Sequence, residues 1–261
     1  MKSFNRSKKV IFTELDKQIL KETEINESGP GTILKDFNSL LNYLKFNKVE
    51  ATKSNSFFAL KHLNPINEQL SNPLRIGLDR PQQRSLPNIS GLYLLLRTLG
   101  IVKLCPSGKK LFFQLNELVL YLWKNLNNTE RYFTLLEGWL LKSNPSGLLN
   151  EFRPRSGLLL STCSRFWEDI PKRGLNAAME NNFEESIKNI PGSYNIALLD
   201  MFGLLDIVYG NPKPGKGWTI LTIKRNPLGD AIFNYLNYKI LGTEDSFEFL
   251  IDYEMNIIII R

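Results

Sequence analysis

Eight polar or basic side chains between residues 80 and 110 have the chemistry to bind nucleic acid. Arginine, glutamine and asparagine side chains can bond to base edges, and lysine and arginine bind phosphates. Six of the eight lie in or just before a leucine-rich segment, LPNISGLYLLLRTLG, and two follow it in a turn. The candidate nucleic-acid-binding residues are Arg80, Gln82, Gln83, Arg84, Asn88, Arg97, Lys109 and Lys110.

Side chains typical of catalysis or metal binding form no recognisable constellation. His62 is the only histidine, and its helical neighbours predict a partly buried or surface position. Cys105 and Cys163 match no metal-ligand spacing, so reduced thiols are the default. The segment GNPKPGKG lacks the spacing of a phosphate-binding loop. We therefore expect no enzymatic activity, no cofactor and no metal.

Positive charge is concentrated in the middle of the chain. The whole sequence of 261 residues has a net charge of +7, whereas residues 32–150 alone contain 15 basic and 7 acidic side chains. Such a local excess favours a polyanionic partner. No apolar run reaches the length of a membrane helix, and charges interrupt the N-terminal segment too early for a signal peptide. We therefore expect a cytoplasmic protein without a membrane partner.

The spacing of apolar residues predicts helices over most of the first half. A short helix is expected near residues 13–23, a second over 32–46 with Thr32 as its N-cap, and a third broken or restarted at Asn64-Pro65. KVEATKSNS reads as a loop. Pro87 suits the first turn of the leucine-rich helix, and Gly100 can end it.

A predicted β-hairpin follows this helix. IVKL and LFFQL read as strands, and the CPSGKK turn between them contains Pro106 and Gly108. NELVLYLWKNL and TERYFTLLEGWLL then return to helix, with Asn128 as the expected cap of the latter. Three helices, a hairpin and a helix, in that order, are typical of a winged helix.

A similar order recurs later in the chain. An apolar helix ends at Gly203, LLDIV and WTILTI flank a polar turn, and NPLGDAIFNYL begins the next helix. GLLLSTCSRFWEDI and NNFEESIKNI supply two further helices upstream. The sequence thus predicts a mainly α protein with small β-hairpins (α+β), built from tandem winged-helix units.

This order also suggests domain boundaries. We expect a flexible arm over 1–31, a first unit over 32–145, a linker over 146–157 and a second unit over 158–240. The linker is placed there because proline and glycine residues occur in and around this segment. Residues 241–261 are expected to add one or two strands.

Two segments of the first half resemble proteins of the Ri-plasmid ORF-three family. Pro87–Leu95 matches that family's P-x-I-x-G-L-Y-L-L helix, and Leu126–Trp139 matches its L-x-x-T-E-R-Y-F-x-L-L-E-x-W helix. The resemblance covers residues 33–145. It implies a plasmid or mobile-element setting and supplies no reaction. Because that family continues into a separate C-terminal α+β domain, we expect a truncated or split relative.

Two functions remain open at the level of sequence. The first is a non-enzymatic DNA-associated protein whose basic first unit contacts duplex DNA. The alternative is a winged-helix scaffold for protein interaction or dimerisation that does not bind nucleic acid. Asp200 and Asp206 in the second unit would repel phosphates, so residues 158–240 are expected to form a homodimer or bind a protein partner instead.

Overall fold

The computed structural model of the protein describes residues 11–149, 159–179 and 191–241. The chain divides into two compact units. The larger comprises residues 24–225, and the smaller combines residues 1–23 with residues 226–261. This division differs from the predicted one, in which the boundary lies near residue 150.

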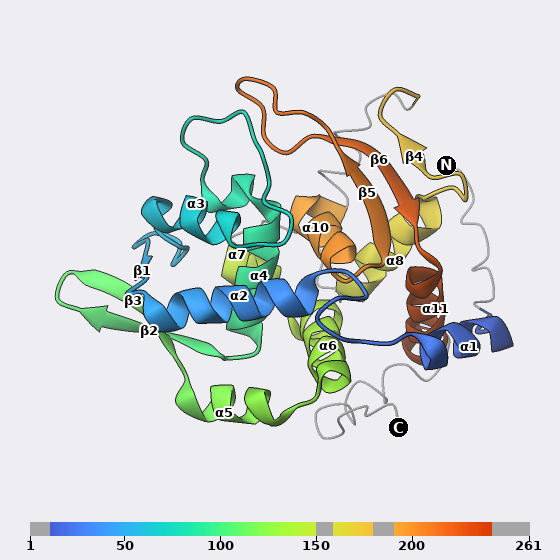
Figure 1. The fold of residues 1–261 in the computed structure, drawn as a ribbon, viewed down its shortest axis with the longest axis horizontal. Helices are drawn as coiled ribbons and strands as arrows, with labels where there is room; N and C mark the ends of the chain where they lie inside the picture. Colours follow the sequence, from blue (N-terminus) through green and yellow to red (C-terminus); the bar gives the residue numbers. More distant parts are fainter. Residues whose placement is uncertain (1–10, 150–158, 180–190, 242–261) are drawn as a thin grey trace, which may run out of the picture. The chain divides into compact units, whose positions relative to one another are not determined.

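The first half of the larger unit contains three helices followed by a hairpin (Figure 1). The helices are α2 (Ile33–Phe46), α3 (Leu60–Glu68) and α4 (Pro87–Thr98), with a 3₁₀ turn, η1 (Gln83–Ser85), before α4. The hairpin is β2 (Val102–Ser107) and β3 (Lys110–Leu115). It is followed by α5 (Glu117–Asn125), α6 (Asn128–Glu137), a π-helical turn η2 (Gly138–Lys142) and α7 (Pro145–Leu149).

The second half of this unit has a similar order. It contains α8 (Leu159–Asp169), β4 (Leu175–Asn176), α10 (Ser193–Met201), β5 (Leu205–Tyr209) and β6 (Ile220–Arg225). In each half a helix ends at a glycine with positive φ, Gly100 at +65° and Gly203 at +69°, and a hairpin follows. A short upstream strand joins the second strand of each hairpin, so the sheet orders are β1-β3-β2 and β4-β6-β5, where β1 is Glu50–Ala51.

Helices α4 and α10 pack against each other at the centre of the larger unit. Every residue of α4 from Pro87 to Leu96 is buried, and α10 is buried from Tyr194 to Leu199. At Gly91 an added Cβ would lie 2.7 Å from Leu198 Cγ, so the glycine permits the close approach. Two hydrogen bonds reinforce the contact between the halves: Trp139 Nε1 donates to Asn195 Oδ1 (2.8 Å), and Tyr132 Oη donates to the Phe202 carbonyl (2.7 Å).

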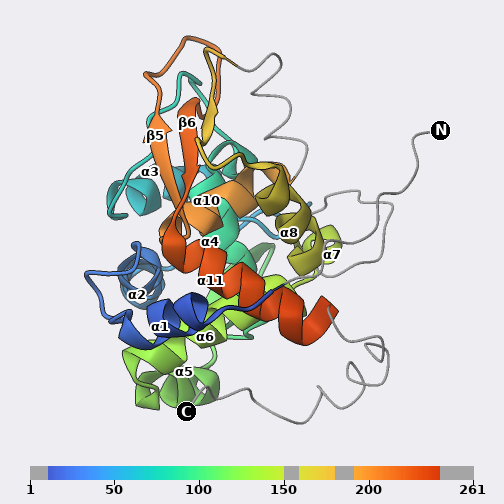
Figure 2. The same cartoon turned by 90° about the vertical axis from the view of Figure 1, so that its right-hand side faces the viewer.

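The smaller unit is built from segments that lie far apart in the sequence. Helix α1 (Glu14–Glu22) packs beside α11 (Pro227–Leu236), which continues into a π-helical turn, η4 (Asn237–Leu241) (Figures 1 and 2). Thr13 and Asp16 form a capping box at the start of α1. Asn234 Nδ2 donates to Asp16 Oδ1 (3.2 Å), and the Phe12 and Tyr235 rings lie 5.3 Å apart.

The observed elements confirm most of the predicted helices and both hairpins. The expectations for NNFEESIKNI and for C-terminal strands fall on residues 180–190 and 242–261, outside the described residues, as does most of the expected linker. The coarse prediction of a mainly helical α+β fold is confirmed: the described residues form ten α-helices and two small three-stranded antiparallel sheets.

Three local predictions are wrong. KVEATKSNS is not entirely a loop, because Glu50 and Ala51 form β1 and pair with Phe112 and Leu111 of β3. Helix α3 is not broken at Pro65 but runs through it. The N-cap of α6 is Asn127 rather than Asn128, because the Asn127 side chain accepts from the Glu130 amide.

None of the helices in the described ranges has both the length and the apolar character needed to cross a bilayer.

Candidate nucleic-acid interface

The predicted residues near the start of α4 divide into buried and exposed groups. Gln83 is 2% exposed, and its Oε1 accepts from the Phe58 amide (2.8 Å). Asn88 is 5% exposed, and its Nδ2 donates to Asn67 Oδ1 (3.3 Å). In this structure both side chains are turned into the protein: Gln83 is bonded to the segment before α3, and Asn88 lies on α4, which packs against α10.

Two of the predicted arginines are held against aromatic rings of the protein. The Arg84 guanidinium lies 5.6 Å from the Phe57 ring centroid, and its Nη2 donates to the Leu149 carbonyl (2.8 Å). Arg97 lies 5.7 Å from the Tyr93 ring and donates to Tyr93 Oη (3.0 Å). These contacts give both arginines a structural role within the larger unit. Arg80 and Gln82 are exposed.

Lys109 and Lys110 are exposed at the tip of the first hairpin, and the structure brings other lysines close to them. Lys110 Nζ and Lys61 Nζ lie 3.0 and 2.9 Å from Glu50 Oε2 on β1. The hydrogen bond from Lys61, with that from Lys110, lowers the pKa of Glu50 to about 2. Glu50 therefore stays ionised, and its one negative charge lies between two positive ones.

The register of the first sheet separates a polar face from an apolar one. Directly opposed residues of antiparallel strands point to the same side, so Glu50, Phe112 and Cys105 share a face, and Lys110 and Gln114 join it at alternate positions along β3. Lys103 is opposite Gln114 on that face. The other face contains Ala51, Val102 and Phe113, all buried. The outer surface of this sheet is therefore polar and rich in lysine.

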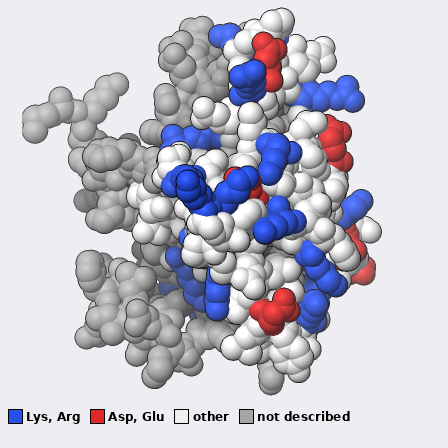
Figure 3. Space-filling view, turned by 90° about the vertical axis from the view of Figure 1, so that its left-hand side faces the viewer, with Lys and Arg blue, Asp and Glu red and all other residues white. Residues whose placement is uncertain are grey.

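One further lysine comes from the segment between α2 and β1. Lys48 Nζ lies 4.4 Å from the centroid of the Phe112 ring, in the range of a cation–π contact. We call the exposed lysines around this outer sheet surface the basic face: Lys48, Lys61, Lys103, Lys109 and Lys110. Figure 3 views the side of the molecule on which the hairpin tip, β1 and the end of α2 lie, and shows Lys and Arg side chains over much of it with few acidic ones.

Sequence reasoning missed three members of the basic face: Lys48, Lys61 and Lys103. Lys103 could have been found, because VKLCPS and KLFFQL alternate apolar and polar residues and that period fixes the outward side of each strand. Lys48 and Lys61 could not have been found, because they lie beside the face only once β1 has paired with β3. That pairing joins residues about 60 positions apart in the sequence.

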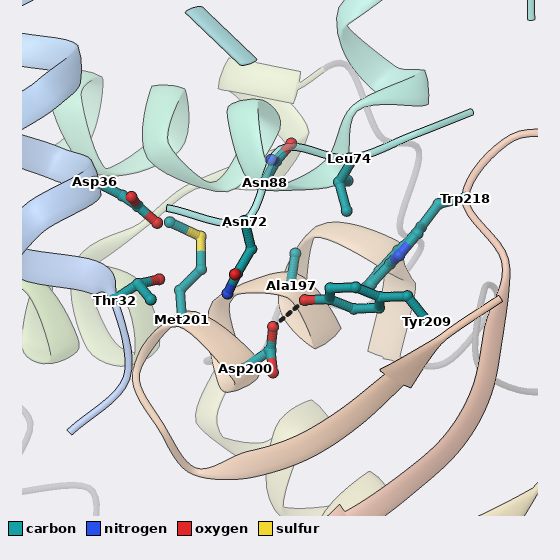
Figure 4. Close-up of a pocket in the computed structure, with 10 residues that line it drawn as sticks. All are labelled: Thr32, Asp36, Asn72, Leu74, Asn88, Ala197, Asp200, Met201, Tyr209 and Trp218. Carbon is teal, nitrogen blue, oxygen red and sulfur yellow. Dashed lines mark hydrogen bonds between the residues drawn. The ribbon is translucent and has the colours of Figure 1, made fainter. Parts of the chain in front are cut away.

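The second hairpin is arranged differently. Asp200, which was expected to repel phosphates, lines a small pocket at the end of α10 (Figure 4). The pocket has a volume of about 10 Å³, enough for about one water molecule. Its lining residues are Thr32, Asp36, Asn72, Leu74, Asn88, Ala197, Asp200, Met201, Tyr209 and Trp218.

A half-buried acid and a tyrosine meet in this pocket. The Tyr209 hydroxyl donates to Asp200 Oδ2, as Figure 4 shows. Burial raises the pKa of Asp200 to about 6, and the nearby charges of Asp206 and Asp36 act in the same direction, against the hydrogen bond from Tyr209. Burial and the adjacent Asp200 also raise the pKa of Tyr209. The pocket is too small for an organic ligand, so we assign this pair a structural role.

His62 is a buried structural residue. Its Nε2 accepts from the Glu50 amide (3.1 Å), and its Nδ1 is 2.9 Å from Tyr43 Oη. Within the described residues no group of three or more His, Cys, Asp or Glu side chains is placed to hold a metal ion.

No known family model matches the sequence, and no curated protein or solved structure matches the chain.

Proposed function

We propose that the protein is a non-enzymatic DNA-associated protein of a plasmid or mobile element, and that its basic face contacts the backbone of duplex DNA. The observation behind the proposal is the gathering of five exposed lysines, from α3, the first hairpin and the segment before β1, on one side of one sheet. Lysine is a flexible point charge that suits phosphate contact without sequence readout.

We also infer that the two repeated halves are tandem winged-helix units. Each has a helix ending at a positive-φ glycine, a hairpin, and a short third strand joined to the second hairpin strand. In the first unit the helix that would enter a DNA groove is buried, so the hairpin and its surroundings replace it as the contact surface. Contact through lysines alone implies binding with little sequence preference.

Salt dependence of duplex binding tests the proposal. The full chain is titrated against a labelled duplex by fluorescence anisotropy at several salt concentrations, alongside the variant K103Q/K109Q/K110Q. We expect log K to fall linearly with log salt concentration for the wild type, and the triple variant to reduce the slope by about three, since each lost phosphate contact contributes about 0.9.

A matched control removes the same charge from the second hairpin. The variant K213Q/K216Q/K224Q also loses three exposed lysines, so its net charge equals that of the first variant. It should leave the slope close to that of the wild type. Binding absent at low salt, or slopes reduced equally by both triple variants, would contradict a role for the basic face.

A further inference from the structure

Helix α5 presents an apolar stripe to solvent. Leu118, Tyr121 and Leu122 are 69%, 64% and 57% exposed. Their spacing of i, i+3 and i+4 places them on one face of the helix. Large apolar side chains clustered in this way are typical of an interaction surface rather than of a solvated helix.

The opposite face holds α5 firmly on the larger unit. Leu120 and Trp123 are buried, and the Trp123 ring lies 5.2 Å from that of Phe37 on α2. Arg131 of α6 fixes the end of the helix by donating to the carbonyls of Trp123 (3.2 Å) and Lys124 (2.9 Å). The apolar stripe is therefore displayed on a preorganised helix, which lowers the entropic cost of docking.

The charges beside the stripe are complementary to those of an identical helix running in the opposite direction. Glu117 and Lys124 are both exposed and lie at opposite ends of α5, with Tyr121 between them on the same side. Two antiparallel copies centred near Tyr121 would place each Glu117 opposite Lys124 of the other copy, and each Leu118 opposite Leu122. Antiparallel helix dipoles add to this arrangement.

We propose that α5 is a self-association surface, through which two copies of the chain pair about a two-fold axis near Tyr121. The interface is isologous: every contact occurs twice. Its small apolar area places it at the weak end of protein–protein interfaces. This inference is independent of DNA binding, since it concerns a surface other than the basic face.

Sedimentation velocity of the full chain without DNA tests the inference. From a few micromolar to several hundred micromolar, we expect the wild type to shift from monomer to dimer. The variant L118Q/L122Q should remain monomeric over the same range. Glu117→Lys or Lys124→Glu alone should weaken dimerisation about tenfold, because each turns two attractive pairs into two repulsive ones.

Mixing the two charge variants distinguishes self-pairing from any other use of this face. In a heterodimer of E117K with K124E every charge pair is opposite in sign again, so the mixture should dimerise although each variant alone does so poorly. Glu68→Lys at the end of α3 serves as a control for charge reversal elsewhere. A wild type that stays monomeric, a dimer insensitive to the α5 variants, or a mixture no better than its components would overturn the proposal.

Discussion

At the scale of single residues, His62 and Asp200 of the larger unit respond to pH in opposite directions. His62 is neutral in the fold because Nε2 accepts a backbone hydrogen bond, and a proton there would face the Glu50 amide proton. The Asp200 carboxyl is favoured in its protonated form by burial. Acidification therefore weakens the fold at one position and strengthens it at the other.

The titration of His62 provides a direct measurement. Burial, and secondarily the charge of Lys61, lower its pKa below 6.5. Because the folded value is depressed, the stability contributed by neutral His62 is present above pH 6.5 and is lost as the pH falls through the folded pKa. Proton NMR of the imidazole ring is unambiguous, because the chain has one histidine. If the pH midpoint of the His62 titration in the folded protein were at or above the midpoint in the urea-unfolded chain, the result would contradict the buried, hydrogen-bonded position of His62.

Replacing Asp200 by asparagine should stabilise the protein at neutral pH. The folded pKa of about 6 lies above the ordinary value of 3.8, so the contribution of this group is complete below about pH 4 and is lost as the pH rises through 6. That difference corresponds to about 3 kcal/mol at neutral pH, and asparagine still accepts from Tyr209. Urea unfolding at pH 7.5 and pH 4.5 should show a clearly larger gain for Asp200→Asn at the higher pH. Equal effects at both would exclude a buried charge as the cause.

At the scale of elements, the contact between α4 and α10 joins the two halves of the larger unit. Gly91 permits it, because any side chain there meets Leu198. We expect Gly91→Ala to destabilise the protein by about 1–3 kcal/mol through overpacking, and Leu198→Ala to destabilise it by about 2–5 kcal/mol through a cavity.

The double variant is the informative one. The methyl group added at position 91 can fill the space left by truncating Leu198. The loss of unfolding free energy in G91A/L198A, measured by denaturant unfolding, should then be smaller than the sum of the two single losses by about 1 kcal/mol or more. Gly217→Ala is the control, because nothing lies within 4 Å of an added Cβ there. Strict additivity would mean that the two positions do not share a contact.

The same contact explains which parts of the fold could be predicted from sequence. The hairpins and helix ends could be, because Gly100, Pro87 and the apolar periodicity act locally. The burial of Asn88 could not be predicted, because the residues that bury it come from other elements, which the periodicity of α4 alone does not reveal. Gly91, which meets Leu198, and the fully buried Leu94 are the local signs of this helix packing. Strand β1 was missed because a strand of two residues is too short to show an alternation of apolar and polar residues. Only its pairing with β3 identifies it as a strand.

At the scale of the whole molecule, the basic face belongs entirely to the larger unit. We expect a chain of residues 24–225 to fold and to keep the salt-dependent duplex affinity of the full protein, because all five lysines lie within it. Circular dichroism and the anisotropy titration check both points. The removed segments include four basic residues among the first ten. A folded fragment with a much shallower salt slope would assign the DNA contact to that segment rather than to the basic face.

The smaller unit combines segments from distant parts of the sequence, which affects how it folds during synthesis on the ribosome. Helix α1 emerges before α11, against which it packs. The two are about 200 residues apart, which corresponds to about 10–40 s at ordinary rates of elongation. During that interval the larger unit can complete its own folding, while the exposed side chains of α1 remain without their partner. The nascent chain should therefore present α1 to chaperones until α11 has emerged.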